Sequence, residues 1–92
     1  MNLYRKGYRA ELKLVKMLKR DGRFHTVLRS AGSRSPFDVV AIGRSRMLLC
    51  QVKTGKGSFK KERRRVRQLR VPRCVKKQIR IYRHGVWSKV SL

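Results

Sequence analysis

Two of the four acidic residues in this chain lie where a solvated surface charge is not expected. Glu11 falls on the apolar side of a predicted helix, and Asp38 lies in the hydrophobic segment 37–42. Gln51 and Lys53 follow in the next apolar segment. A carboxylate removed from water is costly unless it is paired or binds a cation. Such carboxylates among 27 Lys and Arg residues indicate a cation site beside a polyanion, which is the setting of a nuclease.

These residue types suit hydrolysis of a phosphodiester, which needs a divalent cation to polarise the phosphate and activate water. Mg²⁺ prefers oxygen ligands, and Mn²⁺ is the alternative. Asp38 offers a carboxylate, Gln51 an amide oxygen and Val52 its backbone carbonyl, and Glu11 completes the site from the helix. Lys53 would hold the attacking water and offset charge in the transition state.

A formal net charge of +23 on 92 residues indicates a nucleic-acid partner. A membrane surface fits less well, because basic residues run along the whole chain. A purely architectural basic protein remains an alternative. Cys50 and Cys74 follow no zinc-site spacing, and Cys50 is expected to be a buried thiol. Free cysteines, without a signal peptide or membrane span, predict an intracellular protein of the cytoplasm or nucleoid.

Hydrophobic periodicity predicts an α/β fold with a mixed central sheet flanked by helices, in a single domain over residues 1–92. Residues 3–20 place apolar side chains on one side of a helix that ends at Asp21-Gly22. Ser58 is expected to cap the second helix. The expected order is α-β-β-β-α-β-β, over residues 3–20, 24–28, 37–42, 47–53, 59–70, 77–82 and 86–90.

The turn at residues 43–46 sets the geometry of the candidate site. If Gly43 faces Arg46, then Asp38 lies directly opposite Gln51, with Cβ atoms about 4.5–5.5 Å apart. Lys53 is two residues from Gln51 and faces the same way. The three side chains would therefore meet at one end of the hairpin.

This arrangement resembles the PD-(D/E)XK nuclease superfamily, with Pro36 and Asp38 ahead of Gln51-Val52-Lys53. The surrounding sequence is similar to the archaeal-type Holliday junction resolvases over roughly residues 4–53. The matching segments are Tyr4-Arg5-Lys6-Gly7, Ala10-Glu11, Arg29-Ser30-Ala31-Gly32-Ser33 and Asp38-Val39-Val40-Ala41.

The resemblance implies a restriction-endonuclease-like core and a homodimer that nicks four-way DNA junctions in recombination and repair. It assigns metal-site roles to Glu11, Asp38 and Gln51, a catalytic role to Lys53 and a phosphate contact to Arg29. Together with the basic segments, it predicts these DNA contacts: Arg5, Lys6, Arg9, Arg29, Ser33, Arg34, Ser35, Lys56, Lys60, Lys61, Arg63 and Arg64.

Gln51 departs from the family pattern, because a Glu is usual there and the change removes one negative charge. The alternative that it raises is a non-catalytic nucleic-acid-binding protein that keeps a degraded nuclease fold. A nuclease acting on other branched or nicked DNA is a further alternative. At single residues, Glu11 could instead pair with Arg29, Asp38 could form a turn, and Gln51 with Lys53 could belong to a solvated strand face.

Overall fold

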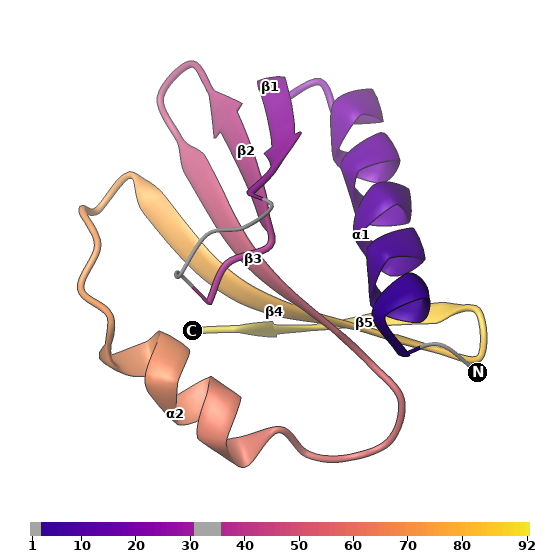
Figure 1. Cartoon of the computed structure of the whole chain (residues 1–92). Coiled ribbons are helices and arrows are strands. Elements are labelled where there is room, and N and C mark those ends of the chain that lie inside the picture. Colours follow the sequence, from indigo (N-terminus) through magenta and orange to yellow (C-terminus); the bar gives the residue numbers. More distant parts are fainter. Residues whose placement is uncertain (1–2, 31–35) are drawn as a thin grey trace.

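A computed structural model describes residues 3–30 and 36–92 of the chain. Its elements are α1 (Leu3–Arg20), β1 (Phe24–Arg29), β2 (Val39–Gly43), β3 (Met47–Thr54), α2 (Lys60–Gln68), β4 (Val75–Arg83) and β5 (Val86–Ser91). The strands form one sheet in the order β1-β2-β3-β4-β5 (Figure 1). Neighbouring strands are antiparallel except for β3 and β4, which are parallel. The predicted α/β class, mixed sheet and element order are confirmed.

One face of the sheet is covered by α1, which lies along β1, β2 and β3 (Figure 1). Ala10, Leu14 and Leu18 recur every four residues and so project from one side of the helix. They form a core with sheet residues such as Val39 and Cys50, and Leu14, Val39 and Cys50 are fully buried. The packing of this side of the helix brings the neighbouring Glu11 toward the sheet.

The opposite face of the sheet carries a second, smaller core under α2. Parallel neighbours need a crossover connection, and α2 provides it between β3 and β4. Val66 is fully buried against Ile79, Ile81 and Phe37. In residues 3–30 and 36–92 there is no helix long and apolar enough to cross a membrane.

Lys77 is buried, and its ammonium binds the C-terminal end of α2. Its Nζ donates to the backbone carbonyls of Val66, Arg67 and Leu69 at 2.5–3.0 Å. The last carbonyls of a helix lack partners within the helix and carry partial negative charge. The lysine therefore satisfies these oxygens and ties α2 to β4.

The turn between β2 and β3 sets the register of the hairpin. The N–H of Gly43 donates to the carbonyl of Arg46 at 2.7 Å, and Val39 pairs with Cys50. The predicted register is thus confirmed for residues 39–42 with 47–50, whereas the predicted pair of Asp38 with Gln51 lies beyond the end of this ladder. A Cβ on Gly43 would lie 2.3 Å from the backbone oxygen of Arg23, so the turn accepts no side chain there. The β4–β5 turn follows the expected His84-Gly85, and both residues have positive φ.

Three local predictions were wrong. Phe59, not Ser58, is the N-cap of α2, in a left-handed conformation (φ 53°) and without a side-chain cap bond. Phe37 and Asp38 precede β2, because Asp38 uses its backbone N–H and its side chain to bind β3 at offset positions. The second helix ends at Gln68, before the predicted residue 70, where the lysine cap binds its carbonyls.

The two cysteines are free thiols with different environments. Cys50 is fully buried, as predicted, and burial raises the pKa of its thiol to about 11. Cys74 is exposed at the start of β4.

The ammonium of Lys77 should contribute substantially to stability. Lys77→Met keeps the apolar stem but leaves the three carbonyls without their charged donor, so the free energy of unfolding should fall by about 2 kcal/mol. Urea denaturation followed by circular dichroism measures this change. The control is Lys76→Met, since Lys76 is exposed on the other face and its replacement removes the same charge. Equal stability of the two variants would contradict the capping role.

Candidate active site

Asp38 is fixed between β1 and β3 by three hydrogen bonds. The N–H of Val52 donates to its Oδ2 at 2.8 Å. Its own N–H donates to the carbonyl of Cys50 at 2.8 Å, and its carbonyl accepts the N–H of Ser30 at 3.0 Å. These bonds hold the carboxylate against β3, which is the strand that carries the other predicted site residues.

Gln51 lies between the two β3 residues that bind Asp38. Its side chain is buried, with 8% of the residue exposed, so the solvated-strand-face alternative is wrong for this residue. Within the described part of the chain, its Oε1 is a buried oxygen without a hydrogen-bond partner. Leaving such a group unsatisfied costs about 1–3 kcal/mol. A buried, unpartnered oxygen is the kind of atom that a cation would bind, and this one belongs to the strand that holds Asp38.

Glu11 approaches from α1 and forms an ion pair with Arg29 of β1. The Nε of Arg29 donates to Oε1 of Glu11 at 3.0 Å, and both side chains are about four-fifths buried. The Arg29 guanidinium also lies over the ring of Tyr8, 4.4 Å from its centroid. The ion pair considered from the sequence is therefore present. Because a guanidinium has five N–H donors, this pair leaves donors for a phosphate.

Lys53 lies at the end of β3, where the loop to α2 is held in place. Its Nζ is 6.0 Å from the centroid of the Phe59 ring, and the Arg83 guanidinium is 5.6 Å from the same ring. Arg83 also donates to the carbonyls of Gly55 and Gly57. One arginine from β4 thus fixes the loop and the ring against which the lysine lies.

Both carboxylates of the candidate site have raised pKa values. Burial raises the pKa of Glu11, and the negative charge of Asp38 raises it further, against the lowering effect of Arg29. Burial also raises the pKa of Asp38, although the Val52 N–H, Lys53 and Arg29 oppose this. Perturbed carboxylates with specific charged neighbours are typical of functional sites. The four charged side chains therefore act within one electrostatic centre.

A cation at this centre would depend on the amide of Gln51. In residues 3–30 and 36–92, no three His, Cys, Asp or Glu side chains come together as a metal site. Two carboxylates and one unpartnered amide oxygen form a ligand set of oxygens only, which fits a hard cation such as Mg²⁺. The N–H of Val52 binds Asp38, and its backbone carbonyl stays a predicted ligand of the cation.

Part of the predicted DNA-contact set gathers on α2. Lys60, Arg63 and Arg64 line a shallow hollow of about 260 Å³ together with Arg67, which the sequence-based prediction omitted. Arg9, Lys56 and Lys61 are exposed outside this hollow, and Arg29 lies in the candidate site described above. The remaining predicted contacts lie outside the described residues (Ser33, Arg34 and Ser35) or outside the described side chains (Arg5 and Lys6).

Several supporting residues were missed from the sequence. Tyr8 was given no role in the site, although the Arg29 guanidinium lies over its ring; its position about one turn before Glu11 could have indicated this. Phe59 was interpreted as a helix residue and Arg83 was given no role, although both hold the loop after Lys53. Arg83 is distant in sequence, so no local pattern could identify it.

The comparison with protein families agrees with this geometry. The family model described as archaeal Holliday junction resolvase (Hjc) matches residues 2–71, which is most of the chain and includes every residue of the candidate centre. No curated protein matches the chain. The chain therefore belongs to the archaeal Holliday junction resolvase family.

Proposed function

We propose that this chain is a metal-dependent endonuclease that nicks four-way DNA junctions, with its active site at Glu11, Asp38, Gln51 and Lys53. The family is one of Holliday junction resolvases, so a nuclease acting on junction DNA is the expected activity. The observation that supports the proposal is the position of Gln51, whose buried Oε1 has no partner, between the two β3 residues that fix Asp38. A solvated or purely structural strand end would need neither feature.

Each residue of the proposed active site has a distinct task. The Val52 N–H holds the Asp38 carboxylate in place, and Arg29 holds Glu11. Lys53 orients the attacking water and balances negative charge as the phosphate is attacked, because an ammonium stabilises charge that develops in the transition state. The free donors of Arg29 contact the neighbouring phosphate.

The oxygens of Glu11, Asp38 and Gln51 would hold Mg²⁺, or Mn²⁺ in its place. When bound, the cation supplies Lewis acidity toward the phosphate and lowers the pKa of water. Without the cation, the site holds two partly buried carboxylates, and the charge of Asp38 raises the pKa of Glu11, which is an unfavourable arrangement that a cation would relieve.

A four-way junction has two symmetry-related strands to nick, so we propose that two copies act together as a homodimer. Closed twofold symmetry is the commonest form of homo-oligomer. Junction shape would be recognised through backbone contacts, for which the basic hollow on α2 is suited.

The second candidate function is junction binding without cleavage, and the observation that favours it is Gln51 itself. Replacement of the usual Glu leaves two carboxylates, so the cation would bind more weakly than in the family pattern. Tight junction binding without nicking in Mg²⁺ or Mn²⁺, unchanged in Asp38→Ala, would establish this alternative.

Asp38→Asn should abolish nicking while leaving the fold intact. The amide oxygen can still accept the Val52 N–H, but the negative charge is lost. Nicking of a synthetic four-way junction in Mg²⁺ should fall by at least about 100-fold, the upper end of losses seen for residues that merely support a metal ligand. Gel assays of nicking and of junction binding in EDTA separate the two effects. Asp21→Asn is the charge-matched control, since Asp21 pairs with Arg23 elsewhere. Full activity of Asp38→Asn would refute the assigned site.

Gln51→Glu should retain or raise activity, because it adds a third carboxylate beside Asp38 and Glu11. The Mg²⁺ concentration for half-maximal nicking should fall several-fold, and Mg²⁺ should raise the melting temperature more than in wild type. Gln68→Glu, at the exposed end of α2, adds the same charge away from the centre. Complete loss of activity in Gln51→Glu alone would contradict a ligand role for this position.

Without divalent metal, the charge on Asp38 should cost stability at neutral pH. The pKa of Asp38 is raised above 3.8 in the folded protein, so the folded state binds more protons than the unfolded state, and stability falls as pH rises through the raised pKa. Asp38→Asn removes this ionisation. In EDTA it should therefore be at least as stable as wild type at pH 7.5, with the difference closing as pH is lowered toward 4. Urea denaturation at several pH values measures the difference, and a gap that widens at low pH would contradict the assignment.

A further inference from the structure

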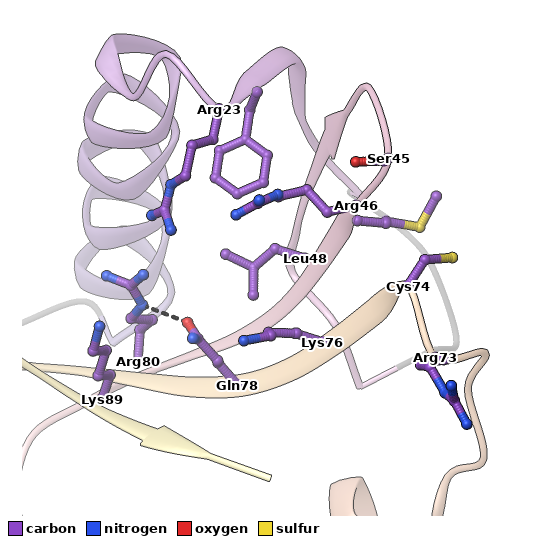
Figure 2. Close-up of a pocket in the computed structure, with 12 residues that line it drawn as sticks. Arg23, Ser45, Arg46, Leu48, Arg73, Cys74, Lys76, Gln78, Arg80 and Lys89 are labelled. Atoms are coloured by element: carbon purple, nitrogen blue, oxygen red, sulfur yellow. Dashed lines mark hydrogen bonds between the residues drawn. The ribbon is translucent and has the colours of Figure 1, made fainter.

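A pocket of about 420 Å³ lies on the face of the sheet that carries α1, away from the candidate active site. Its lining comes from the segment after α1, from the β2–β3 turn and β3, from the start of β4 and from β5. Figure 2 shows charged side chains from several segments gathered around Leu48. The lining residues are Arg23, Phe24, Ser45, Arg46, Met47, Leu48, Arg73, Cys74, Lys76, Gln78, Arg80 and Lys89.

Basic residues make up half of this lining, and none of the described lining residues is acidic. Asp21 lies near one side of the pocket, where it binds Arg23 through both carboxylate oxygens. The charge of Arg46 also lowers the pKa of Asp21. It offsets part of the positive charge on that side. Lys76, Arg80 and Lys89 have no ion pair in the described part of the chain.

The sheet holds these three cations together on one face. Lys76 and Arg80 alternate along β4 and so point to the same side, and Lys89 pairs with Arg80 across the β4–β5 ladder. Figure 2 shows Gln78 between them, and its Oε1 accepts the Nε of Arg80 at 2.9 Å. Because like charges on neighbouring positions of a sheet repel, a polyanionic ligand would stabilise the arrangement.

The position of the pocket suits a DNA arm bound at the candidate active site. Arg46 and Met47 lie at one end of the β2–β3 hairpin, and Gln51 lies four residues from Met47 along β3, which is about 14 Å at 3.4 Å per residue. Gln51 alternates with Cys50, which faces α1, so its side chain and the pocket lie on opposite faces of the sheet and are separated by more than this length. The backbone of a DNA strand advances about 3.4 Å per nucleotide along the duplex axis. The phosphates that reach the pocket would therefore lie more than about four nucleotides from the cut.

We propose that this pocket is a phosphate-binding site, separate from the active site and from the basic hollow on α2. Its ligand is a run of phosphate groups, and the phosphates of a junction arm several nucleotides from the cut are the source that the geometry favours. This assignment of a source rests on the proposed function. A free polyphosphate carries the same chemistry, and the experiment below separates the two sources.

The test compares two double variants that each remove two exposed lysines. Lys76→Ala/Lys89→Ala empties the pocket of two cations, and Lys16→Ala/Lys19→Ala removes the same charge from the outer side of α1. Junction binding is measured in EDTA across a range of salt concentrations, so the result does not depend on nicking. The pocket variant should bind roughly 10-fold more weakly, and its log–log salt slope should become shallower by about 0.9 for each phosphate that it no longer neutralises. The control should change affinity less than about 2-fold.

Neutral methylphosphonate linkages built into the junction DNA show whether the junction arm is the source of the bound phosphates. Placed at successive positions from about four nucleotides outward from the cut, these linkages should weaken binding by the wild-type protein at one or more positions but not binding by the pocket variant. If the junction results are unchanged, yet tripolyphosphate raises the melting temperature of wild type and not of the pocket variant, free polyphosphate is the ligand. Equal behaviour of the pocket and control variants in both the junction and tripolyphosphate assays would overturn the proposal. Failure of the proposed function is read separately, as absence of nicking by the wild-type protein.

Discussion

The bond from the Val52 N–H to the Asp38 carboxylate is the contact on which the candidate site depends. It draws the residue out of the regular β2 ladder and holds it against β3, beside Gln51. A strand continued to Asp38 would have used its backbone groups in the ladder and left the carboxylate free to turn. Asp38 is thus outside the regular strand pairing, and as a result its carboxylate is fixed in a partly buried position.

Other contacts maintain that position from a distance. The close approach at Gly43 sets the register of the hairpin, and the register brings the end of β2 next to Gln51. On the other side, Arg83 fixes the loop that follows Lys53. The site is therefore supported by segments from both halves of the sheet.

The features that depend on neighbouring residues were predictable from the sequence. The apolar side of α1 has a clear helical period, and the turn from Gly43 to Arg46 determines the register, so the helix and the β2–β3 pairing could be predicted. What failed depends on contacts between distant segments. Phe59 takes a left-handed conformation at the start of α2, where Lys53 and Arg83 lie against its ring. These tertiary contacts, rather than the capping preference of Ser58, determine where α2 begins. Likewise, the lysines of the pocket are separate surface charges in the sequence, and only the sheet aligns them.

The two thiols differ in exposure, so one of them can be labelled selectively for spectroscopy. Cys50 is sealed in the core with a pKa of about 11, while Cys74 is exposed at the rim of the basic pocket. A thiol-reactive fluorophore or spin label would accordingly attach at one defined place in the native protein. Occupancy of the pocket can then be followed as a change in the signal of that label, without introducing a cysteine or removing one.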